Sequence, residues 1–315
     1  MVGGGATPER PLTAGPGSEL AGLYGPGSEA WRINREASLL LGAGPRALLL
    51  QIAHPLVAEG VDQHSDFRDD LWARLSGTLA SYLRIVYGTG TAARAEIRRL
   101  NALHRGVAGP VRDDGAQQRF GTAYTARDPD LSLWVHATLV DATLTAVDAW
   151  LEPLAHDRRA RFYAETLPVG RLLGVPEDRL PADIDAFDAY VAAMLAPSGP
   201  VHPSATAREL ASVILHPPLA PLAEAGPVAG LLGGAAPSVA AVFRGVSPGA
   251  YDWLMVPAIG LLPPATRAEY GLPWGVRERA INAWLVTTWG WWRRVLPARW
   301  RWFPQALAAD ERVAR

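Results

Sequence analysis

Apolar residues recur every three to four positions along most of the 315-residue chain, which is the spacing of helices that bury one face. The longest such segment covers residues 128–154, where Asp128 is placed to cap the helix and Pro129 follows in its first turn. Alternating runs of Val, Ile and Thr closed by Asn-Gly, which indicate β-hairpins, are missing from the sequence. The pattern therefore predicts an all-α protein.

Caps and prolines divide the first part of the chain into two predicted helices. Ser28 is placed to cap the first helix, and Gly42 to end it. The second begins with Pro45 near its N-terminus, where a missing N–H needs no partner. Pro55 then removes one backbone donor, so we expect a kink beside His54.

Residues 70–109 predict two consecutive helices separated by a Gly-Thr-Gly break. Ser65 is placed to cap the first of them. Either Thr89 or Thr91 is placed to cap the second, which carries His104. Because the linker is short, we expect the two helices to pack antiparallel.

The chain is predicted to hold a flexible leader over residues 1–27 and one helical domain over residues 28–315. Proline density rises after about Pro197, which predicts short, broken helices there. A final helix over residues 276–297 precedes an arginine-rich tail, so the domain ends in a Pro- and Trp-rich helical extension. The six tryptophans of this extension are Trp284, Trp289, Trp291, Trp292, Trp300 and Trp302. They suit either packing against the core or a peripheral membrane contact.

Composition excludes several classes of protein. The 30 basic and 31 acidic residues nearly cancel, so no nucleic-acid partner is expected. Every basic residue is arginine, which excludes Schiff-base chemistry and a phosphate-loop lysine. The absence of cysteine excludes disulfides, zinc–thiolate sites and iron–sulfur clusters. Since we find neither a secretory signal nor a run of 18 apolar residues, we expect a cytoplasmic location.

Three of the seven histidines, His54, His104 and His136, lie inside apolar helical patterns, where each can fill the core or bind a ligand. The Glu-x-x-His pairs of di-iron bundles and the His-Glu-x-x-His motif of zinc peptidases do not occur. His64 lies near several aspartates, but at irregular spacing, and two of these aspartates suit the first turn of a helix better than a metal site. No Gly-x-Ser-x-Gly elbow is found.

Haem remains as a candidate cofactor. A b-type haem needs one axial histidine, an apolar slot and cations for two propionates. Arg74 and Thr78 share one face of their helix, and His104 can reach that face from an antiparallel neighbour. Arg74 and Arg84 are candidate cations for the propionates. The alternative for both arginines is an exposed or ion-paired helix surface.

Several segments, taken in their order along the chain, resemble the DUF2236 family, which includes latex-clearing rubber oxygenases and fungal MpaB-type oxygenases that cleave a prenyl chain. The resemblance covers roughly residues 30–195. The segments that carry it are LLLGAGPRALLLQIAHPLVAEGVDQHSDF, RLSGTLASYLRIVYGTG, LHRGVAG and YTARDPDLSLWVHATLVDA.

The resemblance implies an all-α, globin-like core that binds haem b. His104 matches the family's proximal iron ligand, and Arg74 and Thr78 match the Arg and Thr of the R-x-x-x-T pattern close to the haem. Gly77 stands where rubber oxygenases have a lysine with a part in rubber cleavage, so polyisoprene is not the expected substrate. His136 belongs to a motif common in the family and is a candidate for the haem pocket.

The sequence thus predicts a haem-dependent oxygenase that combines O₂ with a small apolar substrate of isoprenoid or other unsaturated type. In this hypothesis His104 holds the iron, Arg74 donates hydrogen bonds to developing charge, and Thr78 positions dioxygen or water. Arg84 pairs with a propionate. The alternatives are a non-catalytic haem or lipid carrier, and a helical scaffold or membrane partner without a metal.

Overall fold

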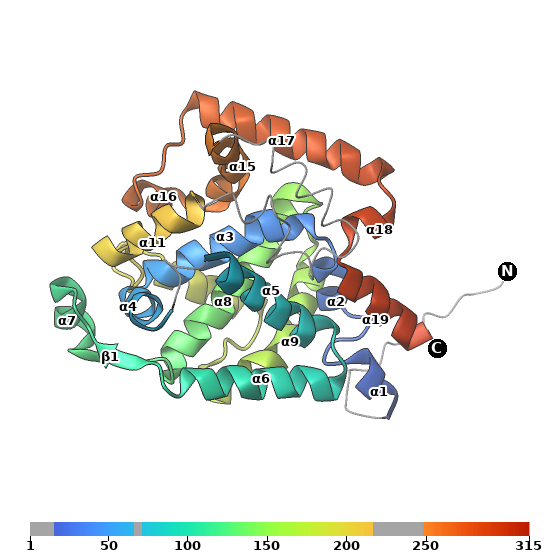
Figure 1. Ribbon diagram of the computed structural model, residues 1–315, viewed down its shortest axis with the longest axis horizontal. Coiled ribbons are helices and arrows are strands. Elements are labelled where there is room, and N and C mark those ends of the chain that lie inside the picture. The colour runs from blue at the N-terminus through green and yellow to red at the C-terminus, as the bar shows by residue number, and fades with distance from the viewer. Residues whose placement is uncertain (1–15, 66–70, 217–247, 315) are drawn as a thin grey trace.

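The computed structural model describes residues 16–65, 71–216 and 248–314, which form one mostly helical body (Figure 1). The predicted all-α class is confirmed. The N-terminal half contains α1 (Pro16–Ala21), α2 (Glu29–Asn34), α3 (Ser38–Ala53), α4 (Pro55–His64), α5 (Leu71–Tyr87), α6 (Gly90–His104), β1 (Ala108–Pro110), α7 (Asp114–Phe120), β2 (Ala123–Thr125) and α8 (Pro129–Trp150). The C-terminal half contains α9 (His156–Leu172), a 3₁₀ turn η1 (Glu177–Arg179), α10 (Ile184–Met194), α11 (Ala205–Leu215), α15 (Pro248–Leu261), α16 (Pro264–Glu269), α17 (Val276–Val295), α18 (Ala298–Arg301) and α19 (Pro304–Ala314).

The N-terminal segment joins the helical body earlier than predicted. Residues 1–15 of the expected leader lie outside the described residues. In the remainder of it, α1 contacts α6 and α19, and Tyr24 is buried. Ser28 caps α2 as predicted, because its hydroxyl accepts a hydrogen bond from the Trp31 N–H at 3.0 Å.

The break predicted between Gly42 and Pro45 is wrong, because α3 runs through both residues. A Cβ at position 42 would overlap the ring of Trp150 on α8. Gly42 therefore permits a close approach of α3 to α8 and does not end a helix. The packing of these two helices outweighs the local cost of Gly42 and Pro45 inside α3.

The kink predicted at Pro55 is confirmed, since α3 and α4 meet there at an angle of 103°. His54 lies between the two helices with extended backbone angles, as expected of a residue that precedes proline. The cap predicted at Ser65 is wrong. This residue ends α4, and its N–H donates to the carbonyl of Val61 at 3.1 Å. Residues 66–70, which follow it, lie outside the described residues.

A small sheet between α6 and α8 was not predicted. Strand β1 pairs antiparallel with β2, with Gly109 opposite Tyr124, and α7 connects the two strands. Each strand has three residues, which is too short for a period of two to be visible in the sequence. The helix that follows, α8, begins as predicted with Asp128 as its N-cap.

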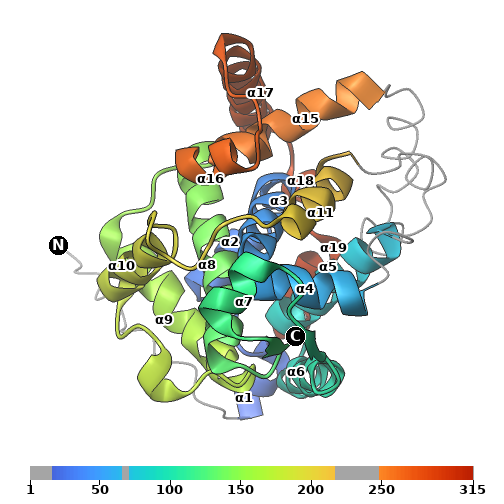
Figure 2. The same cartoon turned by 90° about the vertical axis from the view of Figure 1, so that its left-hand side faces the viewer.

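Helices α3 and α8 pack along each other at the centre of the molecule (Figures 1 and 2). Trp134 of α8 is fully buried, and its indole N–H donates to the carbonyl of Leu50 at 3.1 Å. One buried ion pair, Arg46 with Asp141 at 2.5 Å, also joins these helices. Among the described helices, no single one is long and apolar enough to cross a membrane, and only the sharply bent pair α3–α4 meets the length and composition test.

The C-terminal extension has the predicted form where it is described. The helix predicted over residues 276–297 is α17, which follows the shorter helices α15 and α16, but it is not the final helix, because α18 and α19 follow it. Residues 217–247 lie outside the described residues. After α17 the chain returns to the N-terminal helices, since the Phe303 N–H donates to the Arg35 carbonyl at 3.0 Å and the Trp31 indole donates to Asp310 at 2.8 Å.

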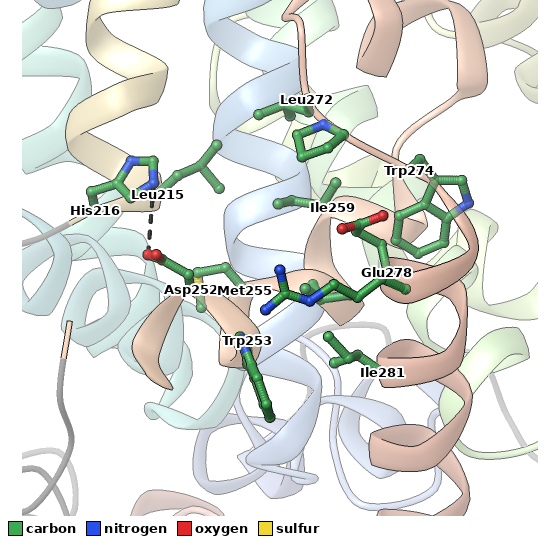
Figure 3. A pocket seen from close by; sticks show the side chains of 13 residues that line it. Leu215, His216, Asp252, Trp253, Met255, Ile259, Leu272, Trp274, Glu278 and Ile281 are labelled. Carbon is green, nitrogen blue, oxygen red and sulfur yellow. Dashed lines mark ion pairs between the residues drawn. The ribbon is translucent and has the colours of Figure 1, made fainter. Parts of the chain in front are cut away.

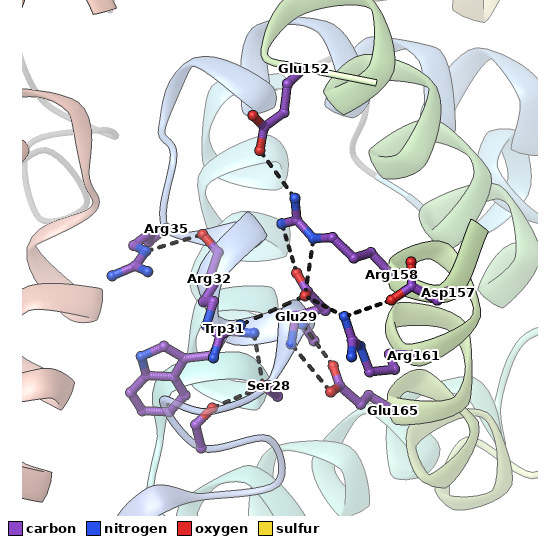
Figure 4. A network of polar contacts seen from close by, with 12 residues as sticks. Ser28, Glu29, Trp31, Arg32, Arg35, Glu152, Asp157, Arg158, Arg161 and Glu165 are labelled. Carbon is purple, nitrogen blue, oxygen red and sulfur yellow. Dashed lines mark hydrogen bonds and ion pairs between the residues drawn. The ribbon is translucent and has the colours of Figure 1, made fainter. Parts of the chain in front are cut away.

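A buried ionic cluster joins α2 to α9 (Figure 4). The carboxylate of Glu29 is 3% exposed and accepts two hydrogen bonds from Arg158, at 3.1 and 3.0 Å. Glu165 of α9 accepts hydrogen bonds from the N–H groups of Glu29 and Ala30, so it satisfies free donors at the start of α2. Burial raises the pKa of Glu165. The cluster fixes the position of α2 on α9.

Candidate functional site

The helices α5 and α6 pack antiparallel, as the short linker predicted. Thr89 is the cap of α6, where its hydroxyl accepts from the Ala92 N–H at 3.2 Å. The middle of this helix pair differs from its end. In the middle, Ser81 of α5 donates to the buried carboxylate of Glu96 at 2.5 Å. At the end away from the linker, which we call the open end, Arg74 of α5 is near enough to His104 of α6 for its charge to act on the ring.

His104 is the last residue of α6 and is exposed to solvent, although neighbouring groups cover part of its ring. Its ring makes no hydrogen bond to any described residue. The surrounding protein lowers the pKa of His104 by burial, and the positive charge of Arg74 lowers this pKa further. The imidazole is therefore neutral at neutral pH, which is the form that binds a metal ion.

Arg74 and Thr78 lie one turn apart on α5, and both are exposed. The Thr78 hydroxyl donates to the Arg74 carbonyl at 2.9 Å, which leaves its oxygen free to accept a hydrogen bond. The Arg74 guanidinium has no ion-pair partner among the described residues. A Cβ at Gly77 would meet nothing within 4 Å, so this part of the face is open. The structure thus brings Arg74 close to His104, as the sequence predicted.

Arg84 belongs to an ion-paired helix surface, which is the alternative that the sequence left open for it. Its guanidinium pairs with Glu96 at 2.6 Å, and Arg99 pairs with the same carboxylate at 2.5 Å. These hydrogen bonds, together with the one from Ser81, lower the pKa of Glu96 to about 2. Arg84 therefore already has a carboxylate partner within the protein, and we do not assign it to a propionate.

His136 lies in the middle of α8 and is buried. Burial lowers the pKa of His136 to about 4, so the ring is neutral, and its Nε2 has no hydrogen-bond partner. A Cβ at Gly170 of α9 would come within 3.3 Å of this nitrogen, so the glycine makes space for the ring. The same end of α9 touches α6, because the Asn101 amide donates to the Leu172 carbonyl at 2.8 Å.

His54, whose role the sequence left open, is also buried with an unpartnered nitrogen, Nδ1. Its ring lies 5.1 Å from that of Phe120. Burial, with a smaller effect from the charge of Arg119, lowers the pKa of His54 to about 4. Among the described residues, no three His, Asp or Glu side chains are grouped to hold a metal ion. Three of the aspartates near His64 lie outside those residues.

A separate cavity of about 640 Å³ lies between α11, α15 and the start of α17 (Figure 3). Its lining is mostly apolar and includes Met255 and Trp274. At one edge His216 lies 3.7 Å from Asp252, and Arg277 lines the cavity from α17. Helices α17 and α6 lie on opposite sides of the body in both views (Figures 1 and 2), so this cavity is distinct from the His104 face. No local pattern predicted this cavity, because its lining comes from three separate segments of the chain.

Comparison with known proteins identifies the family. The family model described as "ER-bound oxygenase mpaB/B'/Rubber oxygenase, catalytic domain" matches residues 31–296, which is more than half of the chain and includes Arg74, Thr78, His104 and His136. No curated protein and no solved structure gives a match, so the globin-like arrangement stays a prediction. Membership of this family implies an oxygenase. The chain belongs to the family of MpaB and rubber oxygenase catalytic domains.

Proposed function

We propose that this oxygenase depends on haem b and acts on a small apolar substrate, with isoprenoid or other unsaturated chains as the expected class. The observation that carries the proposal is that His104 and Arg74 lie near each other at the open end of α5 and α6, where the charge of Arg74 helps to lower the pKa of the histidine. Neither the imidazole nor the guanidinium has a hydrogen-bond or ion-pair partner among the described residues. In a member of an oxygenase family, such a pair is available to bind a cofactor.

The residues present fit a haem group. His104 offers a neutral imidazole, which is the usual protein ligand of a b-type haem iron. Arg74 offers a positive charge that no carboxylate of the described residues neutralises, which suits a propionate or an anionic oxygen species. Bound haem b would supply the iron centre at which dioxygen is activated. The chain has no cysteine or lysine to compete as a ligand.

The roles of the side chains follow from their contacts. Arg74 donates hydrogen bonds toward negative charge that develops during the reaction. Thr78 accepts a hydrogen bond from bound water, because its own proton is used in the bond to the Arg74 carbonyl. His104 holds the cofactor and, being neutral, takes up no proton near pH 7.

His136 is proposed as a second residue of the cofactor pocket. A buried nitrogen without a partner is uncommon in folded proteins and calls for a specific explanation. A group bound beside the ring would explain why this nitrogen is unpartnered, and Gly170 allows the ring to pack closely against α9. At neutral pH the ring is uncharged, so it donates or accepts one hydrogen bond and carries no charge.

The absorption spectrum of the purified full-length protein tests the proposal. We expect a Soret band, either as purified or after addition of haemin, and we expect His104→Ala to abolish it. His156→Ala is a matched control, because His156 is also exposed and makes only a surface contact with Asp185. Far-ultraviolet circular dichroism should be unchanged in both variants. A wild-type protein that gains no band with haemin contradicts the proposal, as does a band that survives His104→Ala.

A haem or lipid carrier without catalytic activity is the second candidate, and the apolar cavity beside α15 favours it. A carrier that binds haem would show the Soret band but would consume no oxygen with any unsaturated lipid. Oxygen uptake measured with an electrode, with isoprenoid alcohols and unsaturated fatty acids as substrates, separates the two candidates. We expect uptake by the wild-type protein and none by His104→Ala.

A further inference from the structure

Helix α17 stands at the edge of the molecule and is poorly covered (Figures 1 and 2). None of its 20 residues is buried, whereas α3 and α8 each bury many residues. Its main contact is with α15. A helix of this length in a folded domain normally buries one apolar stripe.

The apolar residues of α17 lie on two sides of the helix. Ile281 lines the cavity and Val286 packs against the core, whereas other apolar side chains lie on the outer side. Val276 is 78% exposed, Trp284 63%, Trp291 56% and Val295 56%. These four residues follow one another at intervals of eight, seven and four, so they lie on one face of the helix. Trp300 of α18, at 65% exposed, follows this stripe along the chain. We call these five residues the tryptophan face.

The charges around the tryptophan face are almost all positive. Arg294 and Arg299 are exposed and have no ion-pair partner among the described residues. Between residues 276 and 302 the only carboxylate is Glu278, which accepts a hydrogen bond from the Gly275 N–H at the start of α17. An exposed indole beside an unpaired arginine suits the boundary between lipid headgroups and acyl chains.

We propose that the tryptophan face docks on the surface of an anionic phospholipid bilayer. In this arrangement α17, about 30 Å long at 1.5 Å per residue, lies flat in the interface. The indoles enter the headgroup region, and Arg294 and Arg299 meet lipid phosphates. A second copy of the chain fits this face less well. Two such faces would place arginine against arginine without a carboxylate between them.

Vesicle co-sedimentation of the purified full-length protein tests the proposal, whether or not the protein holds haem. We expect binding to vesicles of phosphatidylcholine with phosphatidylglycerol, weaker binding to phosphatidylcholine alone, and a loss of binding as salt is raised. The double variant Trp284→Ser/Trp291→Ser should lower the partition coefficient roughly 100-fold. Arg294→Gln/Arg299→Gln should lower it roughly 10-fold, since each cation near an anionic surface contributes about fivefold at most.

Two control variants remove similar side chains elsewhere. Leu41→Ser removes a side chain that is 61% exposed on α3, and Arg98→Gln removes an exposed charge on α6. Both should bind vesicles as the wild-type protein does. Wild-type binding that the tryptophan variant retains overturns the proposal. The proposal is also overturned if the wild-type protein binds no vesicle and sediments as a dimer, and if Trp284→Ser/Trp291→Ser converts that dimer to a monomer. The tryptophan face would then be covered by a second copy of the chain.

Discussion

The arginines at two places in this protein have different surroundings. Arg158 of α9 donates twice to the buried carboxylate of Glu29, and it also lies 3.2 Å from Glu152 at the surface (Figure 4). Arg74 of α5 has no carboxylate beside it among the described residues, and its charge acts on the neutral ring of His104. The first arginine stabilises the fold, whereas the second has no carboxylate partner in the described part of the chain and is proposed to meet a ligand.

The same contrast occurs within one helix pair. In the middle of α5 and α6, Glu96 accepts hydrogen bonds from Ser81, Arg84 and Arg99. At the open end, no carboxylate among the described residues pairs with Arg74. In a chain whose basic residues are all arginine, the number of arginines therefore says little about function. An unpaired arginine next to an unpartnered histidine is the informative feature.

The largest expected effect is on catalytic activity and concerns Arg74 at the open end of α5 and α6. Arg74→Gln should lower kcat roughly 100- to 1,000-fold, equivalent to about 3–4 kcal/mol, because a hydrogen-bond donor to developing charge is lost. The free energy of unfolding should change by less than about 0.5 kcal/mol, since the side chain is exposed. Oxygen-uptake kinetics and urea unfolding measure the two quantities. An unchanged kcat would place Arg74 with the structural arginines.

The ionic cluster should respond in the opposite way. Glu29→Ala leaves Arg158 without its buried partner and should lower the free energy of unfolding by about 2–3 kcal/mol. Haem binding should stay as in the wild-type protein. Glu152→Ala is the matched control, because it removes a surface contact of the same arginine and should cost well under 1 kcal/mol. Equal effects of the two variants in urea unfolding would contradict this assignment.

The contacts of Glu96, in the middle of α5 and α6, should make the stability of the protein depend on pH. The pKa of Glu96 is lowered from 4.5 to about 2, so the ionised carboxylate is favoured by the folded state. Its stabilisation is complete above about pH 4.5 and is lost as the pH falls toward 2. We expect a loss of about 2 kcal/mol over this range, because Arg84 and Arg99 are half-exposed.

Glu96→Gln isolates this contribution. The variant should be less stable than the wild-type protein at pH 6, and the difference in urea midpoint should narrow as the pH approaches 2. A difference that does not change with pH would show that the carboxylate gains no stability from its charged partners.

The smallest expected effect is on stability and concerns Gly77, on the α5 face that carries Arg74 and Thr78. Gly77→Ala should raise the free energy of unfolding by about 0.5–1 kcal/mol, because alanine favours the helix and its Cβ meets nothing within 4 Å. Gly42→Ala, by contrast, should lower the thermal midpoint, since its Cβ overlaps the Trp150 ring. Thermal unfolding of both variants measures this. A Gly77→Ala variant that is less stable would mean that the face is covered.

The sequence predicted the features that depend on local patterns. Apolar periodicity located α5, α6, α8 and α17, and capping residues placed the starts of α2 and α8. The family resemblance and the placing of Arg74 near His104 also came from residues close together in the chain. Where long-range packing decided the structure, local signals failed, as at Gly42, which the sequence assigned to a helix end.

By itself, then, the sequence determined the helical class, the family and the helix faces that carry Arg74, Thr78 and His104, because helical periodicity and motif order are properties of neighbouring residues. Only the tertiary structure decided which arginines are already paired, that the nitrogens of His54 and His136 are buried without partners, and that a cavity forms beside α15. Charge pairing and burial depend on segments far apart in the chain, and no local pattern records them.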